Sequence, residues 1–329
     1  MNKPKNLKFI DLFAGVGGFH YAMGDACQRL GLSHECVFAS DIDDSCRENY
    51  STNFDIAPVG DITKFDESHI PEHDVLLAGF PCQAFSIIGD RKGFEDTRGT
   101  LFFDIARILK FRQPKLFILE NVKQLRGHDK GQTLKVILET CKQLGYKCDY
   151  FVLNALDFGL PQKRERIFIV GWRDDKTLKF DFENLNIRRS TLDDVLELDV
   201  DKKYFASAHI LAKRKKAVKV KQISHGRNTI WHENKNGNIS AYEYSCALRA
   251  GASHNYLLVN GVRRLTEREM MSLQGFPKHH KITGTYNTVK KHAGNSLPIP
   301  MASEVIFQAV RQLWSDSTIG TAATFTFSE

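Results

Sequence analysis

The chain has 329 residues, a formal net charge of +7 and seven cysteines, and its apolar and charged contents are those of an ordinary globular protein. No apolar run approaches the roughly 20 residues of a membrane span. The N-terminus lacks the apolar core of a signal peptide, so a cytoplasmic protein with no membrane-bound part is expected. The length is sufficient for one large domain and a smaller one.

The cysteines are odd in number and widely scattered, and no CxxC or Cys/His metal pattern occurs. Structural disulfides and a zinc site are therefore not expected, and no metal is predicted. Most of the cysteines are expected to be small core residues.

The first 173 residues alternate between strand-like and helix-like patterns. Strands are predicted at 8–13, 35–40, 75–80, 115–121, 147–153 and 167–172. Helices are predicted from a glycine-rich turn to about residue 30, and at 42–54, 101–111 and 133–144. The runs at 75–80 and 115–121 are apolar without alternation, as strands buried on both faces of a parallel sheet are. The pattern predicts an α/β protein with a doubly wound, mostly parallel sheet and ligands at the carboxyl ends of its strands.

The rhythm breaks at about Lys176, and residues 181–284 combine short strands, Asn/Gly turns and a basic run. An amphipathic helix opened by prolines follows within 294–314. We therefore predict a larger domain made of residues 1–180 and 285–329, with a smaller domain, residues 181–284, inserted into it.

The stretch "DLFAGVGGF" (11–19) follows a predicted strand and opens a helix. Gly15, Gly17 and Gly18 permit a tight turn and the close backbone approach that a nucleotide-type cofactor needs. The spacing is not GxGxxG, and such a turn alone is as often structural as functional. Asp41 ends the second strand, where a carboxylate can bind a ribose diol, and Asp61 lies on the same edge.

Cys82 follows Pro81 at the end of one predicted strand, and Glu120 ends the neighbouring one, so both side chains are expected at the same rim of the sheet. A thiolate beside a carboxyl able to be protonated suits attack on an electron-poor heterocycle, because the carboxyl can hydrogen-bond a ring nitrogen while sulfur adds to carbon. A buried structural Cys/Glu pair is the alternative. A cysteine hydrolase would need a histidine base, and none follows Cys82 with such a signature.

Two further groups of basic residues are candidates for anion contacts. Arg164 and Arg166 are two residues apart, so in an extended segment they share a face. Between Lys202 and Lys235 there are ten Lys/Arg and one acidic residue, Glu233, a net charge larger than that of the whole chain. A phosphate-facing surface is one interpretation and a solvated face is the other.

These segments, in this order, resemble the cytosine-5 DNA methyltransferase family in its bacterial restriction–modification branch. The resemblance covers most of residues 8–173 and 263–310. It rests on "DLFAGVGGF", "SDID", "GDIT", "GFPCQAFS", "RGTLFFDIARIL", "ENV", "NALDFGLPQKRERIF", "RRLTEREMMSLQGFP" and "GNS". Residues 181–260 correspond to the family's variable target-recognition region, where the resemblance is faint.

The resemblance implies an S-adenosylmethionine-dependent methyltransferase fold and methyl transfer to C5 of a cytosine in a short sequence of double-stranded DNA. The cytosine would be flipped out of the duplex. Cys82 would then add to C6, while Glu120 contacts N3 and Arg166 contacts the O2 side, with Arg164 in the same catalytic set. S-adenosylmethionine would be bound by Phe13, Gly15, Gly17, Gly18, Phe19, Asp41, Ile42, Asp61, Ile62, Phe80, Leu101, Asn295 and Ser296.

Residues 83–101 would form a mobile loop that closes over DNA, with Gly89, Gly93 and Gly99 absorbing the backbone change. The expected DNA contacts are Gln83, Ser86, Ile88, Arg98, Gln162, Lys213, Arg214, Lys215, Lys216, Arg227 and Arg249. A monomer encoded by a bacterium or phage is expected. A cognate restriction endonuclease that acts on the same site without touching this chain is compatible with so compact an enzyme.

Three positions depart from what such enzymes usually carry. Ala247 precedes Leu248 where a threonine is usual, so a hydroxyl contact to the flipped nucleotide's phosphate would be missing. Ile88 and Ile42 also differ. Two other functions stay open, a transferase acting on tRNA and a catalytically silent DNA-binding protein. The tRNA branch typically carries a Cys-Phe-Thr signature that is absent here, and the complete Cys82, Glu120 and Arg166 set argues against the second.

Overall fold

The computed structural model describes residues 6–81, 101–218, 227–234 and 236–314. The chain divides into two compact units. The first unit comprises residues 1–153, 165–183 and 302–323, and the second comprises 154–164, 184–301 and 324–329. These units are defined by contacts alone. The two domains predicted from the sequence, with boundaries at 180/181 and 284/285, stay a prediction.

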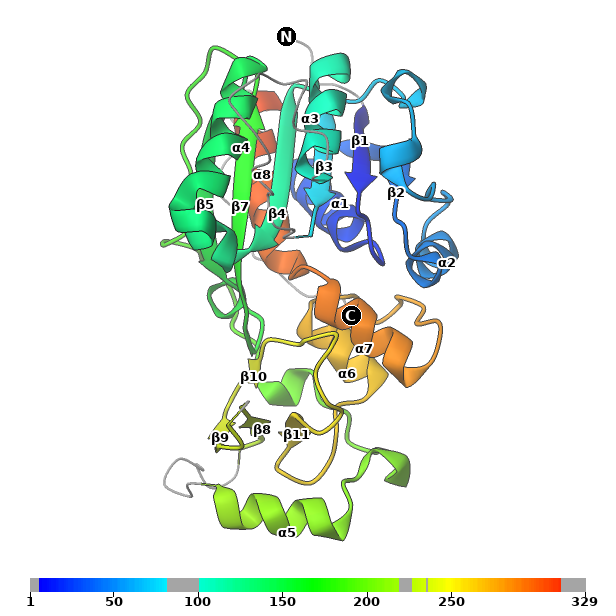
Figure 1. Cartoon of the computed structure of the whole chain (residues 1–329), viewed down its shortest axis with the longest axis vertical. Helices are drawn as coiled ribbons and strands as arrows, with labels where there is room; N and C mark the ends of the chain where they lie inside the picture. Colours follow the sequence, from blue (N-terminus) through cyan, green and yellow to red (C-terminus); the bar gives the residue numbers. More distant parts are fainter. Residues whose placement is uncertain (1–5, 82–100, 219–226, 235, 315–329) are drawn as a thin grey trace. The chain divides into compact units, whose positions relative to one another are not determined.

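The first unit is built on a six-stranded sheet in the order β2-β1-β3-β4-β7-β5 (Figure 1). β1 pairs in parallel with β2 and β3, and β3 with β4, whereas β4 and β7 are antiparallel. The mostly parallel α/β sheet predicted from the sequence is confirmed. Its strands are β1 (Asn6–Leu12), β2 (Ser33–Ser40), β3 (Val75–Gly79), β4 (Leu116–Val122), β5 (Lys147–Asn154) and β7 (Glu165–Trp172).

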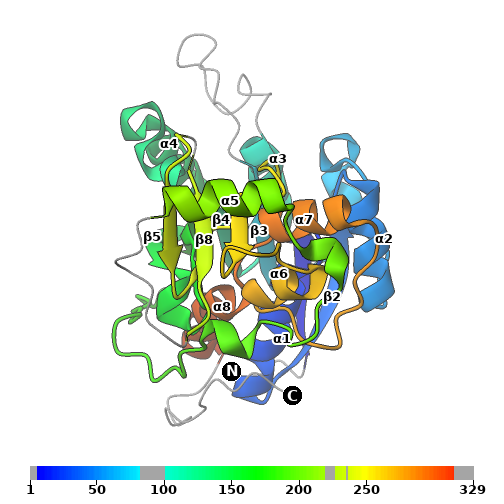
Figure 2. The same ribbon diagram turned by 90° about the horizontal axis from the view of Figure 1, so that it is seen from below.

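Helices cover both faces of this sheet (Figure 2). α3 (Leu101–Arg112) and α4 (Gln132–Gln143) pack on one face, where their apolar side chains join those of β1, β3, β4 and β7 in one core. α1 (Gly18–Leu30) and α8 (Ile299–Trp314) lie on the other face, and Arg29 pairs with Glu304 at 2.7 Å between them. α2 (Asp44–Asn53) follows β2.

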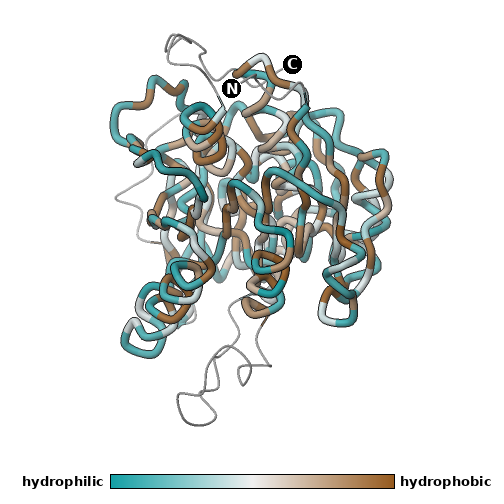
Figure 3. Tube along the Cα trace, turned by 90° about the horizontal axis from the view of Figure 1, so that it is seen from above, coloured by the Kyte–Doolittle hydropathy of each residue, from teal (hydrophilic) through white to brown (hydrophobic). Residues whose placement is uncertain are grey.

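The central strands form as the sequence predicts because they are apolar on both sides. The side chains of β3 from Val75 to Ala78 and of β4 from Leu116 to Leu119 are inaccessible to solvent. In Figure 3, hydrophobic and hydrophilic segments alternate along the trace, with hydrophobic ones running through its middle. Burial on both faces requires helices above and below, and it leaves the carboxyl ends of the parallel strands as the edge where polar residues gather.

The second unit contains short strands and small helices. β8 (Ile230–Glu233) pairs antiparallel with β9 (Ile239–Tyr242) and β11 (Leu257–Val259). β6 (Gln162–Lys163) pairs in parallel with β10 (Ser245–Cys246). The helices are α5 (Ala208–Ala217), α6 (Glu267–Leu273) and α7 (Tyr286–Asn295).

Across the parts of the chain that the structure describes, none of the helices combines the length and the apolar character needed to cross a membrane.

Candidate active site

The carboxyl end of β4 carries a carboxylate held by an arginine. Glu120 is opposite Gly79 of β3 in the parallel pairing, and Val122 is opposite Arg166 of β7 in the antiparallel one. Residues two apart on a strand face the same side, so Arg166 reaches Glu120 diagonally. Arg166 Nε lies 2.7 Å from Glu120 Oε1, and both side chains are nearly buried, 13% and 10% exposed. A charge-assisted contact this short fixes the carboxyl at the rim.

The end of β3 beside this pair is also fixed. Asn121 Nδ2 donates a hydrogen bond of 2.9 Å to the carbonyl of Phe80. A Cβ on Gly79 would lie 3.7 Å from Glu120 Oε2, an ordinary van der Waals contact, so the end of β3 runs beside the carboxyl. The first described stretch ends at Pro81. Cys82 lies outside the described residues, as do Gln83, Ser86, Ile88 and Arg98.

The glycine turn after β1 is closed by Asp41. The Gly15 N–H donates to Asp41 Oδ2 at 2.7 Å, and the Asp43 N–H donates to Oδ1 at 2.8 Å. Burial raises the pKa of the Asp41 carboxyl, and these backbone donors oppose the shift. Phe13, with φ 54°, is a non-glycine residue in the left-handed region at the start of this turn. Such strain persists where the surroundings impose it and is frequent at functional sites.

A buried polar group that sequence reasoning missed lies behind the turn. Phe54 stacks on His20 with ring centroids 3.8 Å apart, and a Cβ on Gly17 would come 2.1 Å from the Phe54 ring. The Tyr50 hydroxyl donates to Asp11 Oδ2 at 3.3 Å and lies 2.9 Å from His20 Nδ1. Burial raises the pKa of Asp11 well above its ordinary value and lowers that of His20 to about 3. The available signal was a charged residue, Asp11, inside the otherwise apolar end of β1 in "IDLF".

Other predicted cofactor residues lie along this carboxyl edge. Ile42 is 74% exposed beside Asp41, whereas Gly18, Phe19, Ile62 and Phe80 are buried. Asp61 caps a short 3₁₀ helix, and its hydrogen bonds from Thr63 lower its pKa. Leu101 begins α3. A carboxylate and an exposed apolar side chain next to a glycine turn fit the ribose and the flat base of a nucleoside-containing cofactor.

Asn295 and Ser296 belong to the second unit, at the end of α7. Asn295 is exposed, and the Ser296 hydroxyl donates to the carbonyl of His292 at 2.8 Å. The carbonyl of Ser296 accepts a hydrogen bond from Arg164.

The two arginines predicted to act together have different partners. Arg164 is 1% exposed, and its guanidinium donates to the carbonyls of Leu248, Gly294 and Ser296. Arg166 instead pairs with Glu120. Gln162, a predicted DNA contact, is fully buried, and its Nε2 donates to the carbonyl of Leu273 at 2.7 Å.

The four basic residues of helix α5 that were predicted to contact DNA differ in their exposure to solvent. Lys213, Lys215 and Lys216 are exposed, whereas Arg214 is only 2% exposed. Arg214 Nη2 lies 2.8 Å from Glu233 Oε2, so this arginine belongs to the packing of the unit rather than to its surface. Of the remaining two, Arg227 pairs with Glu243, and the exposed Arg249 places its guanidinium over the Tyr256 ring.

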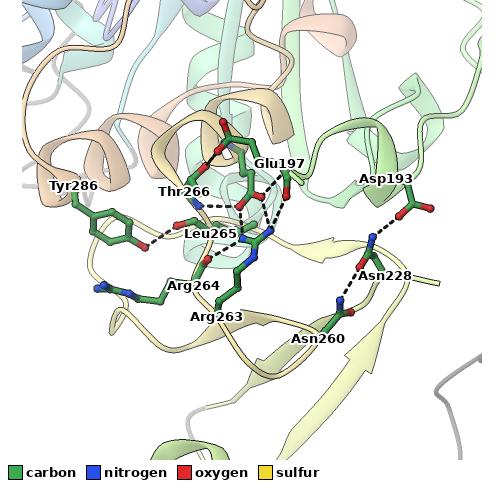
Figure 4. Close-up of polar contacts among 10 residues, drawn as sticks. Asp193, Glu197, Asn228, Asn260, Arg263, Arg264, Leu265, Thr266 and Tyr286 are labelled. Atoms are coloured by element: carbon green, nitrogen blue, oxygen red, sulfur yellow. Dashed lines mark hydrogen bonds and ion pairs between the residues drawn. The ribbon is translucent and has the colours of Figure 1, made fainter. Parts of the chain in front are cut away.

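The motif "RRLTERE" folds around a buried ion pair (Figure 4). Arg263 makes two contacts with the Glu269 carboxylate, at 2.7 and 2.8 Å. The Thr266 N–H, at the N-cap of α6, donates to the same carboxylate at 2.8 Å, and the Glu197 N–H donates at 2.9 Å. This network secures the start of α6, so the matching motif has a structural explanation.

No group of three or more metal-ligating side chains is found among the residues that the structure describes. A cavity of about 320 Å³ lies at the other end of the strands from Glu120, near Lys8, His73 and Arg112. It contains none of the predicted site residues.

The model of the family "C-5 cytosine-specific DNA methylase" matches residues 7–311. Type II methyltransferase M.NgoBI of Neisseria gonorrhoeae is 52% identical over 94% of this chain and 93% of that protein. Type II methyltransferase M.HhaI of Haemophilus parahaemolyticus is 39% identical over 92% of this chain and 93% of that protein.

A crystal structure of a Spodoptera frugiperda DNMT2 mutant has a similar fold, with a TM-score of 0.71. The match covers 92% of this chain and 99% of the DNMT2 chain, at 19% sequence identity.

Proposed function

The chain belongs to the C-5 cytosine-specific DNA methylase family, whose similar members are type II methyltransferases, and we propose that it methylates C5 of a cytosine in a short sequence of double-stranded DNA. The observation that carries this proposal is the Arg166–Glu120 pair on the strand next to the one leading to Cys82. A fixed carboxyl beside a nucleophile is what activation of a cytosine ring requires.

The reaction has two stages at the base. The Cys82 thiolate adds to C6 and opens the C5–C6 double bond, and Glu120 supplies a proton to N3. The electron pair released at C5 would attack the methyl group of S-adenosylmethionine, which would leave as S-adenosylhomocysteine. Loss of the C5 proton to a base would then restore the double bond and expel the Cys82 thiolate, and the N3 proton would return to Glu120. Arg166 orients Glu120 and contacts the O2 side of the ring. These atoms are inaccessible inside the base stack, so the cytosine is flipped out of the duplex.

S-adenosylmethionine, when bound, supplies an electrophilic methyl group. Asp41 is suited to bind the ribose hydroxyls, and the exposed Ile42 is suited to contact the base. The glycine turn allows close backbone approach. From the family resemblance, the cofactor contacts also include Phe13, Phe19, Asp61, Ile62, Phe80, Leu101, Asn295 and Ser296.

The DNA contacts we propose begin with the exposed lysines 213, 215 and 216 of α5 and the exposed Arg249. We also propose DNA contacts at four residues that precede α3 in the chain, near the target base: Gln83, Ser86, Ile88 and Arg98. The protein is proposed to act as a monomer in the cytoplasm, alongside an endonuclease that cleaves the same sequence.

One experiment tests the reaction and the substrate together. Tritiated methyl transfer from S-adenosylmethionine is measured with unmethylated plasmid DNA and with tRNA, for the native enzyme and for Cys82→Ser. We expect incorporation into DNA alone and loss of activity in the variant. Transfer to tRNA alone would show that the substrate is tRNA and not DNA. Absence of any transfer would contradict the proposed reaction and favour a catalytically silent DNA-binding protein. Bisulfite sequencing of the DNA identifies the modified cytosine.

A second experiment tests the covalent step. DNA carrying 5-fluorocytosine at the target should form an adduct that survives denaturation, because fluorine cannot leave as a proton does. Formation of the same adduct by Cys82→Ala, or none by the native enzyme, would refute a Cys82–C6 bond.

A further inference from the structure

Arg164 joins two segments of the second unit that are far apart in the sequence. Its Nη1 donates to the carbonyl of Leu248 at 2.8 Å, and its Nη2 donates to the carbonyls of Gly294 and Ser296 at 2.9 and 2.6 Å. The residue is 1% exposed, so these bonds are made in the interior. A planar guanidinium directs its donors from separate nitrogens in fixed directions, whereas an ammonium has its three donors on one nitrogen.

The two segments are also in direct contact. A Cβ built on Gly294 would lie 2.3 Å from the backbone nitrogen of Ala250. Only glycine therefore allows the end of α7, at 294–296, to lie against the stretch at 248–250. The contact requires both backbones to keep their present course.

Gln162, on the short strand β6 two residues before Arg164, reinforces the arrangement. Its Oε1 accepts from the Leu248 N–H at 3.2 Å, while its Nε2 lies 3.3 Å from Gln274 Oε1. Gln274 in turn donates to the carbonyl of Ala293. Leu248 and the end of α7, at 293–296, are thus connected twice, once through Arg164 and once through the two glutamines.

These segments carry different parts of the proposed function. Residues 245–250 belong to the predicted target-recognition region, and residues 295 and 296 are predicted cofactor contacts. We propose that Arg164 is a positioning residue that holds both segments in one arrangement, so that target binding and methyl-donor binding depend on each other. The proposal rests on the proposed function for the identity of the two ligands, and it replaces the catalytic role predicted for Arg164.

Arg164→Lys in the full chain tests the proposal, because lysine keeps the charge but has a single donor nitrogen, which cannot take the positions of both Nη1 and Nη2. With unmethylated plasmid DNA and tritiated S-adenosylmethionine, we expect the KM for both substrates to rise about tenfold, while kcat stays within about threefold. A fall in kcat with both KM values unchanged would instead make Arg164 catalytic. A change in only one KM would show that the segments act separately.

Amide hydrogen exchange of the ligand-free chain gives a readout that does not depend on activity. In Arg164→Lys, the amides of Leu248 and Ser296 should lose protection together. Loss at only one of them, or at neither, overturns the link. If the native enzyme transfers no methyl group, the proposed function fails, yet this measurement still decides whether Arg164 holds the two segments.

Two further variants separate positioning from general damage. Gly294→Ala retains Arg164 but forces the same segments apart, so it should reproduce the paired rise in KM and the paired loss of protection. Arg263→Lys replaces another buried arginine of this unit and weakens its ion pair with Glu269. It should lower stability while both KM values stay within about twofold. If Arg263→Lys raised both KM values like Arg164→Lys, the effect would reflect instability of the unit and the proposal would be wrong.

Discussion

The Nε atom of Arg166 on β7 lies 2.7 Å from Oε1 of Glu120 on β4, across an antiparallel strand pair. Both side chains are nearly buried, so the carboxyl is oriented by a partner that water does not replace. Removing one member of such a pair leaves the other without its partner in a poorly solvated place. Substitutions that keep the shape are therefore the informative ones.

Glu120→Gln keeps the shape of the side chain and a hydrogen-bond donor, but it cannot deliver a proton. We expect a slower single-turnover methyl transfer, with DNA affinity kept within about tenfold, or ~1.4 kcal/mol. The control is Glu165→Gln. Glu165 is the first residue of β7, and its carboxylate pairs with the exposed Lys123 instead of Arg166. That rate should be unchanged. An undiminished rate in Glu120→Gln would show that another group activates the ring.

Gly15 and Gly17 offer a matched comparison within the glycine turn. Both have positive φ, but a Cβ at Gly15 meets no atom within 4 Å, whereas one at Gly17 overlaps the Phe54 ring. Gly15→Ala should destabilise by about 1–2 kcal/mol, the backbone penalty alone. Gly17→Ala should destabilise by clearly more, because Phe54 is stacked on His20. Urea unfolding of the two variants checks this, and equal losses would mean that Phe54 moves freely.

The strands and their common edge could be predicted from the sequence because each is a local pattern. An apolar run without alternation indicates a strand buried on both faces, and parallel strands end at one edge. That reasoning placed Glu120 on the strand beside the one leading to Cys82, and the Gly79–Glu120 pairing has this form. The conformation of Cys82 lies outside the described residues.

The contacts of Arg164 and Arg214 could not be predicted, because they depend on segments distant in the chain. Arg164 binds carbonyls 84, 130 and 132 residues away, and backbone carbonyls leave no mark in a sequence. Arg214 stands in a run of four basic residues, and only the fold of α5 against Glu233 distinguishes it from its neighbours. Charge alone predicted that all four lie on the surface, as phosphate contacts or as a solvated helix face.

His73 should make the protein less stable in acid. It is 8% exposed, and burial lowers its pKa to about 4, with the nearby charge of Arg112 acting in the same direction. The folded state therefore keeps His73 neutral, while the unfolded chain binds a proton below about pH 6.5. The resulting stability is complete above that pH and is lost as pH falls toward 4, by up to about 1.4 kcal/mol per unit.

His73→Gln removes this titration. Urea unfolding at pH 7.5 and 5.0 should show a smaller loss of stability in the variant than in the native protein. His69→Gln, at an exposed position only four residues away, should keep the native pH dependence. If His73→Gln and the native protein lost stability equally, His73 would not be held neutral by the fold.

The three exposed lysines of α5 give the last prediction. If Lys213, Lys215 and Lys216 contact phosphates, each contributes affinity without sequence information. Changing them to alanine should weaken specific and non-specific DNA binding alike and reduce the slope of log K against log salt by roughly 0.9 for each lost contact. S-adenosylmethionine binding and the methylated sequence should be unchanged. Arg214 must be retained, because its burial against Glu233 makes its loss a change in folding.

The control removes the same charge elsewhere, by changing the exposed Lys64, Lys135 and Lys142 of the first unit to alanine. Both triple variants lower the net charge by the same amount, so an effect of net charge alone should appear in both. A direct contact releases counterions only where a lysine meets a phosphate. A shallower slope in the α5 variant than in the control would therefore place α5 on DNA. Equal slopes would identify α5 as a solvated helix face.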